Sequence, residues 1–166
     1  MEGISKEQIY GWLSTVTDPE VPALNILDLG IVRNVEINGS GNDVSVKISI
    51  TPTYSGCPAM DVISIGIRMA LVSRGISKVD IEMQLSPAWT TDWMTEEGKQ
   101  KLKAYGIAPP HRKAFQPLGL FEEDKVTCPR CGSEETELVS QFGPTSCKAL
   151  YKCRSCKEPF EHFKCH

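Results

Sequence analysis

The sequence lacks the features that mark a nucleic-acid-binding or membrane protein. Its 166 residues hold 18 Lys and Arg against 21 Asp and Glu, so there is no basic excess to attract a polyanion. No apolar run approaches membrane-spanning length, and the N-terminus lacks the charged-then-apolar layout of a secretion signal. We therefore expect a cytoplasmic protein whose partners are neither nucleic acid nor membrane.

Motifs of oxygenase and reductase catalysis are also missing. A helical di-iron site would show Glu-x-x-His pairs, but Ala108, Pro159 and Phe163 stand three residues before the three histidines. A nucleotide-binding reductase would show Gly-x-Gly-x-x-Gly, and Val44 interrupts the match that starts at Gly39. The sequence leaves enzymatic activity open but favours a role outside catalysis.

The hydrophobic pattern predicts an α+β fold with a small mixed three-stranded sheet packed with helices. Apolar and polar residues alternate in three stretches, and a capping box of Ser5 and Gln8 predicts where the first helix begins. The expected elements, in chain order, are a helix from Ser5, hairpin strands at 31–37 and 44–50, a largely buried helix at 60–72, a strand at 78–85 and a short helix at 95–105.

The cysteines divide the chain into two parts. Six of the seven follow Lys125, and a proline-containing stretch without a sustained period precedes them. We predict an α/β domain at 1–105, a linker at 106–125 and a small second module at 126–166.

Two Cys-x-x-Cys pairs in the second module predict a metal site in a zinc ribbon. Each pair can present two thiolates to one tetrahedral ion, and four thiolates leave no open position, so the metal should be structural. Iron in a rubredoxin-like site is the alternative, since the same sulfurs suit it. The expected ligands are Cys128, Cys131, Cys153 and Cys156.

Four further candidate ligands lie in the same module. Cys147, His162, Cys165 and His166 could replace one of the chosen cysteines or build a second site. Alternatively, Cys147 packs as a small hydrophobe and the C-terminal tail is exposed. Basic and acidic side chains balance in this module, which favours contact with protein over nucleic acid.

Cys57 is the one cysteine of the first domain. It lies between an expected strand and the start of an expected helix, where unpaired N–H groups and the helix dipole favour a thiolate. The thiolate could ligate metal or attack an electrophile, but a buried cysteine at a helix start is equally compatible. No histidine precedes His111, so a local Cys-His couple is unsupported.

Acidic residues in two loops could converge near Cys57 if the loops share one end of the sheet. They are Asp18, Glu20 and Asp28. The alternative is that Asp18 and Asp28 cap turns.

Two tryptophans, Trp89 and Trp93, follow the third strand in a polar context. An exposed tryptophan is a typical anchor for a docked partner, whereas packing of both rings in the core is the alternative.

Several short motifs together carry a resemblance to a known family. With Asp18–Pro22, Asp28–Val32, Thr51–Pro58 and Pro87–Trp89, the chain resembles the iron-sulfur-cluster assembly domain of bacterial Suf accessory proteins and eukaryotic cytosolic iron-sulfur targeting factors. With Tyr54–Ala59, Trp89–Trp93 and the terminal Phe163–His166 added, it is similar to the family of D subunits of phenylacetyl-CoA epoxidase (ring 1,2-monooxygenase) systems.

The resemblance implies an accessory protein of aerobic phenylacetate degradation that helps to mature the oxygenase or the reductase subunit, its expected partners. It also implies structural zinc and a transient iron or iron-sulfur cluster. The family's Gly-Cys-Pro cysteine maps onto Cys57 and its acidic motif onto Asp18 and Glu20, which become candidate relay residues. A nucleic-acid- or protein-binding zinc-ribbon module and a direct structural component of the oxygenase complex stay open as alternatives, as does a homo-oligomer.

Overall fold

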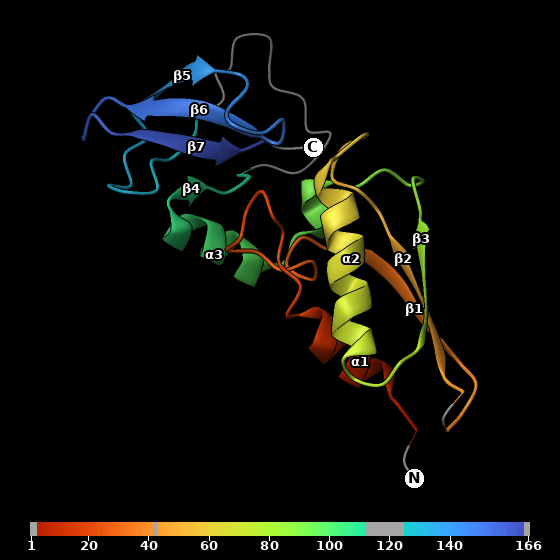
Figure 1. Ribbon diagram of the computed structural model, residues 1–166. Coiled ribbons are helices and arrows are strands. Elements are labelled where there is room, and N and C mark those ends of the chain that lie inside the picture. Colours follow the sequence, from red (N-terminus) through yellow and green to blue (C-terminus); the bar gives the residue numbers. More distant parts are fainter. Residues whose placement is uncertain (1–2, 42, 112–124, 165–166) are drawn as a thin grey trace. The chain divides into compact units, whose positions relative to one another are not determined.

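The computed structural model describes residues 3–41, 43–111 and 125–164, and the chain divides into two compact units (Figure 1). The N-terminal unit comprises Met1–Trp89 with Trp93–Thr95. The C-terminal unit comprises Thr90–Asp92 with Glu96–His166.

Helix α1 (Lys6–Leu13) begins where the capping box predicts. The Ser5 hydroxyl oxygen accepts a hydrogen bond from the Gln8 backbone N–H at 3.2 Å, and the Ser5 N–H donates to Gln8 Oε1 at 2.9 Å. These two bonds satisfy backbone donors that have no partner inside the helix. Ile9 and Leu13, one helical turn apart, are fully buried on the inner face.

The first sheet has the strand order β1-β2-β3 and is mixed, as predicted. Strands β1 (Val32–Asn38) and β2 (Ser45–Ile50) form the expected antiparallel hairpin. Strand β3 (Lys78–Met83) returns parallel to β2 after the helical crossover. Val46, Ile48 and Ile50 of β2, which share one face of the strand, are buried and place that face of the sheet in the core.

Helix α2 (Ala59–Val72) connects β2 to β3 and follows Pro58, which occupies its N-cap position. Ile63, Ile67 and Leu71 are buried. The expectation of a largely buried helix is nevertheless wrong, because several apolar side chains on the opposite side are exposed. These are Val62, Ile65, Met69 and Val72.

The C-terminal unit carries a second sheet, with the order β4-β7-β6-β5. A 3-10 turn (Thr91–Trp93) precedes helix α3 (Glu96–Tyr105) in the chain. The strands are β4 (Ile107–Ala108), β5 (Thr136–Ser140), β6 (Lys148–Cys153) and β7 (Pro159–Phe163). Strands β5, β6 and β7 pair antiparallel, whereas β4 pairs parallel with β7.

The domain limits at 105 and 126 stay predictions, because residues 112–124 lie outside the described part of the chain. Among the described residues, α3 and β4 belong to the C-terminal unit. The pairing of Ile107 and Ala108 with Glu161 and His162 explains this grouping, since it ties the start of the predicted linker to the second sheet.

Candidate metal centre and thiol site

The four cysteines of the predicted metal site come from two similar turns. Cys128 and Cys131 precede β5, whereas Cys153 ends β6 and Cys156 lies in the turn before β7. A residue with positive φ follows each turn: Gly132 at 76° and Lys157 at 66°. This backbone conformation reverses the chain, so that both cysteines of each pair face the same point.

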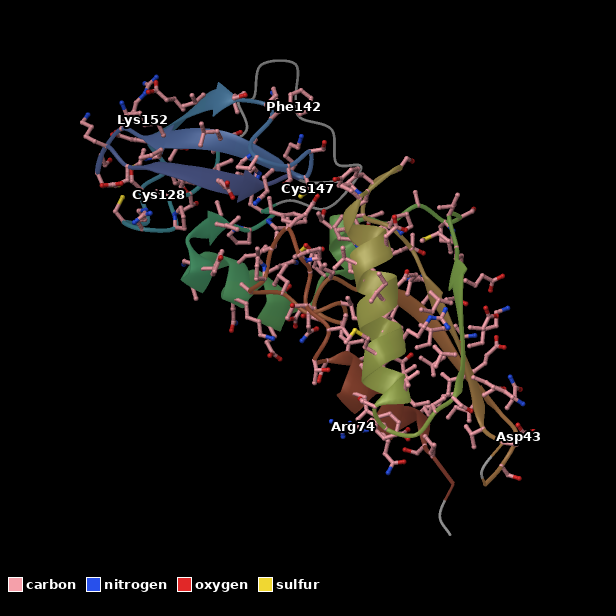
Figure 2. All side chains as sticks on the ribbon, viewed as in Figure 1. Asp43, Arg74, Cys128, Phe142, Cys147 and Lys152 are labelled. Atoms are coloured by element: carbon pink, nitrogen blue, oxygen red, sulfur yellow. The ribbon has the colours of Figure 1, made fainter. Side chains whose placement is uncertain are left out.

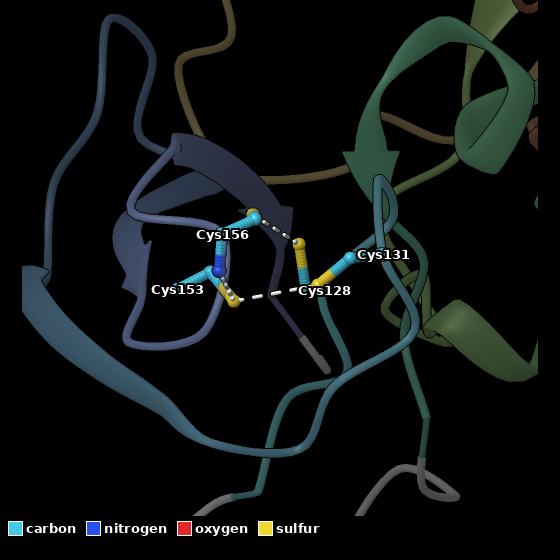
Figure 3. Close-up of side chains that lie close together, drawn as sticks. All are labelled: Cys128, Cys131, Cys153 and Cys156. Atoms are coloured by element: carbon cyan, nitrogen blue, oxygen red, sulfur yellow. Dashed lines mark hydrogen bonds between the residues drawn. The ribbon is translucent and has the colours of Figure 1, made fainter.

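The sulfur positions fit one tetrahedral ion (Figure 3). All four Sγ atoms lie within 4.8 Å of one another. The Cys128–Cys156 pair is 3.8 Å apart and the Cys131–Cys153 pair 3.6 Å, far longer than the roughly 2.05 Å of a disulfide. Zinc–thiolate bonds of about 2.3 Å in a tetrahedron put the sulfurs about 3.8 Å apart, so the donor set matches a closed four-thiolate site.

The protein environment already favours one thiolate in this cluster. The pKa of Cys153 falls to about 6, mainly because the backbone N–H of Cys156, 3.5 Å from the Cys153 sulfur, donates to it. The pKa of Cys156 rises to about 11: the backbone N–H of Glu158 lowers it, but burial and the other three thiols raise it more. A cation at the centre would remove this competition for protons between the thiols.

The additional candidate ligands are not gathered into a second site within the described ranges. Cys147 is buried, with its sulfur 3.1 Å from Thr145 Oγ1. His162 is also buried, and its Nδ1 lies 3.1 Å from the Ala108 carbonyl oxygen. In residues 3–41, 43–111 and 125–164 the four-cysteine cluster is the one group of three or more potential ligands. Cys165 and His166 lie outside the described residues.

Cys57 lies immediately before α2 and is 8% exposed. Its backbone N–H donates to the Tyr54 carbonyl oxygen at 3.3 Å, and Gly56 between them has a φ of 74°. This tight turn places the Cys57 thiol close enough to Tyr54 to raise the pKa of the tyrosine hydroxyl.

Tyr54 links this turn to the acidic loop. Its hydroxyl donates to Glu20 Oε1 at 3.2 Å, across 34 residues of sequence. Burial raises the pKa of Tyr54, and the contacts with Cys57 and Glu20 raise it further, so the hydroxyl stays protonated. Sequence reasoning missed this residue, although its position three residues before Cys57, in a turn rich in Ser and Gly, was an available signal.

The other two acidic candidates cap turns. Asp18 Oδ1 accepts from the backbone N–H groups of Glu20 and Val21 at 2.7 and 2.9 Å. Asp28 Oδ2 accepts from the Asn25 N–H at 3.1 Å. The Asp18 bonds hold the loop that presents Glu20 to Tyr54, so Asp18 acts on this site through backbone geometry.

The two tryptophans differ in exposure. Trp89 is 4% exposed, and its indole N–H donates to the Leu29 carbonyl oxygen at 2.8 Å. Trp93 is half-buried, and the Arg33 guanidinium lies 3.6 Å from its ring centroid. Trp89 therefore belongs to the core, and a docked partner could reach only Trp93 of the two.

No helix in the described residues is both long and apolar enough to cross a membrane.

Comparison with known proteins defines the class. The iron-sulfur cluster assembly protein family matches residues 6–83, and the PaaD zinc beta ribbon domain family matches residues 113–164. A solved domain of unknown function, DUF59, from Bacillus anthracis is 25% identical with a TM-score of 0.53, covering 58% of this chain and 90% of its own. The chain thus joins an iron-sulfur cluster assembly domain to a zinc ribbon of the PaaD type.

A relative that matches nearly the whole chain narrows this class to a family. The chain is 49% identical over 158 residues to the Escherichia coli (strain K12) protein named as the putative D subunit of 1,2-phenylacetyl-CoA epoxidase, covering 95% of this chain and 92% of that protein. It belongs to this family of D subunits. A Porphyromonas gingivalis "Fe-S protein maturation auxiliary factor" is 38% identical over 99 residues, covering 59% of this chain and 90% of the relative.

Proposed function

We propose that this chain is an accessory protein of a phenylacetyl-CoA epoxidase system and helps to mature the iron or iron-sulfur centre of its oxygenase or reductase subunit. Two kinds of relative support the proposal. The relative that matches nearly the whole chain is named as an epoxidase subunit, whereas a relative that matches 59% of the chain is named as a maturation factor. The first unit would supply the maturation chemistry, and the whole chain would direct it to one client.

The observation that carries the proposal is the hydrogen bond from the Tyr54 hydroxyl to Glu20, which ties the acidic loop to the turn that holds Cys57. It brings a carboxylate to the turn that carries the thiol, at the start of α2. Thiolate and carboxylate are both ligands for iron, and a helix N-terminus favours negative charge. Two protein donors also leave coordination positions for a client's ligands, as transfer requires.

The four-cysteine cluster has a different role in this proposal. It holds zinc, which supplies folding free energy to a sheet too small to be stable from its own core. Four thiolates saturate the ion, so the cluster stabilises the C-terminal unit and takes no part in the transfer of iron.

The test is Cys57→Ser in cells that co-express the epoxidase subunits. We expect the variant to fold and to keep its C-terminal metal, while epoxidase activity and iron per oxygenase both fall by about tenfold or more, as for loss of a metal ligand. Cys147→Ser is the matched control, because Cys147 is also buried but lies outside the cluster.

Unchanged activity and iron content in Cys57→Ser would remove the relay role. If deletion of the chain abolishes activity while Cys57→Ser does not, and both the wild-type and the Cys57→Ser chains co-purify with the oxygenase, the chain is a structural component of the complex instead.

A further inference from the structure

Two buried polar atoms of the first unit have no hydrogen-bond partner among the described residues. They are Arg33 Nε and Thr51 Oγ1. The Thr51 side chain is only 1% exposed. Buried polar groups are nearly always paired, so an unpaired one indicates a partner that the folded chain does not itself supply. A guanidinium N–H can only donate, and the missing partner of Arg33 is therefore an acceptor.

The two side chains lie on the same face of the β1-β2 pair. The Thr51 backbone N–H donates to the Ile31 carbonyl oxygen at 2.9 Å and extends the ladder past its last pair, so Thr51 lies opposite Ile31. Arg33 stands two residues after Ile31 and shares its face, because side chains alternate along a strand. Diagonal neighbours across an antiparallel pair are about 7–8 Å apart, a distance that a long side chain spans.

The Trp93 ring covers the Arg33 guanidinium. The Arg33 Cζ atom lies 3.6 Å from the ring centroid, and Trp93 is half-buried. The Thr95 N–H donates to the Asp28 carbonyl oxygen at 2.9 Å, which holds the backbone of this segment near the start of β1. The Trp93 carbonyl oxygen packs on Gly30, where any Cβ would overlap it. Movement of the ring therefore needs rotation only about its side-chain bonds, while the backbone stays in place.

Arg33 also lacks a charge partner. Among the ion pairs of the described residues none includes Arg33, whereas Lys47 and Lys78 of the same sheet are both paired. A carboxylate supplies both the acceptor and the negative charge. It pairs with a guanidinium through two parallel N–H donors, and its remaining lone pairs can accept the Thr51 hydroxyl.

We propose that Arg33 and Thr51 bind a carboxylate side chain of a protein partner, and that the Trp93 ring turns aside to admit it. A protein partner fits this site better than a small free ion, because the displaced ring needs a new apolar contact and a protein surface provides one. Tryptophan and arginine together are also the residue types that dominate docking interfaces. The identity of the partner rests on the proposed function, in which it is the oxygenase or reductase subunit.

Binding of the full-length chain to the purified epoxidase subunits tests the two donors. Arg33→Gln should raise the dissociation constant by about tenfold or more, because it leaves the partner carboxylate without its counter-charge. Thr51→Val should raise the dissociation constant by about threefold or more without lowering the urea midpoint of the free chain. The free chain loses only a hydroxyl that had no partner, so its stability does not fall.

Arg74→Gln is the matched control. Figure 2 shows Arg74 at the C-terminal end of α2. Its guanidinium also lies over a tryptophan, 5.7 Å from the ring centroid of Trp12, but Arg74 is exposed and is not among the described side chains with a buried unpaired atom. Arg74→Gln should bind the subunits like the wild type.

Fluorine NMR of the chain labelled with 5-fluorotryptophan tests the movement of the ring. The three tryptophans give three resonances, and Trp93→Phe assigns the one that matters. The partner should shift the Trp93 resonance and leave that of the buried Trp89 in place.

Wild-type affinity in Arg33→Gln, a lower urea midpoint in Thr51→Val or an unshifted Trp93 resonance overturns the inference. If sodium acetate alone raises the urea midpoint of the wild type but not of Arg33→Gln, the site takes a small free carboxylate and the assignment to a protein partner is wrong. Cys57→Ser should bind the subunits like the wild type, so failure of the relay role is distinguishable from failure of this site. A wild-type chain that binds no epoxidase subunit contradicts both.

Discussion

A single hydroxyl joins two parts of the candidate iron site. Tyr54 shares a tight turn with Cys57, and its hydroxyl donates to the Glu20 carboxylate from a distant loop. Glu20 and Cys57 are far apart in sequence, so the tyrosine ties the loop of one to the turn of the other. Its protonated state matters for this role, because a phenolate would repel both the carboxylate and a thiolate.

This protonated state predicts a specific pH dependence. Burial and the two contacts raise the pKa of Tyr54 above the ordinary value of 10.0, so the unfolded chain ionises this residue first as the pH increases. The stabilisation that the folded chain gains from a protonated Tyr54 is therefore complete below pH 10.0 and is lost as the pH rises through the pKa of Tyr54 in the folded state. The free energy of unfolding of the wild type minus that of Tyr54→Phe should be constant near neutrality and decrease above pH 10.0.

Urea unfolding at a series of pH values measures this difference. Tyr105→Phe is the control for loss of one phenol, since Tyr105 is 59% exposed. A difference for Tyr54→Phe that does not change between neutral and alkaline pH would contradict the assigned contacts.

At the scale of elements, an ion pair between a buried lysine and a partly exposed glutamate links β6 to β7. Lys148 Nζ lies 2.9 Å from Glu161 Oε2, and the Lys148 side chain is only 6% exposed. By contrast, Arg154 on the turn after β6 pairs with Glu137 of β5 at 3.0 Å, with both side chains exposed. The two pairs have similar geometry but different solvation.

The difference in solvent exposure predicts that breaking the two ion pairs lowers the free energy of unfolding by different amounts. Glu161→Ala removes the carboxylate that pairs with the buried Lys148 ammonium and should lower the free energy of unfolding of the C-terminal unit by about 1–3 kcal/mol. Glu137→Ala should cost less than about 1 kcal/mol, because water screens the exposed pair. Equal decreases in the free energy of unfolding of the two variants, measured by thermal unfolding, would contradict this prediction.

At the scale of the whole molecule, the two units have different sources of stability. The first has a core of apolar side chains between its sheet and helices, whereas the second is small and gathers four cysteines at one point. The three tryptophans, Trp12, Trp89 and Trp93, all belong to the first unit. Their fluorescence therefore reports on that unit alone.

We expect a metal chelator to unfold the C-terminal unit and leave the first unit folded. Structural zinc supplies about 10–16 kcal/mol to such modules, more than their net stability. Metal content and circular dichroism should show the loss, while the tryptophan unfolding transition keeps its midpoint. Cys153→Ser should behave like the chelated protein, and Cys147→Ser like the untreated one.

A soluble Cys153→Ser protein that retains its full metal content would contradict the ligand assignment. A tryptophan transition that shifts together with metal loss would contradict the expectation that the first unit keeps its stability without the metal.

Sequence alone determined the features that depend on near neighbours in the chain. Ser5 and Gln8 fixed the start of α1, because a capping box closes within one turn. Alternation of apolar residues determined β1, β2 and β3, since a strand has a period of two. The spacing of Cys128, Cys131, Cys153 and Cys156 likewise predicted a cluster, because each pair closes its own turn.

Only the tertiary structure decided which faces of the helices and which side chains are covered by other parts of the chain. Residues 60–72 are apolar nearly all round, but one sheet and α1 cover only part of α2, which leaves four apolar side chains exposed: Val62, Ile65, Met69 and Val72. Trp89 could equally have faced solvent, and its buried bond to Leu29 arises from a loop 60 residues away. The meeting of Glu20 with Tyr54 has the same cause: contacts between distant loops depend on packing, which no local pattern encodes.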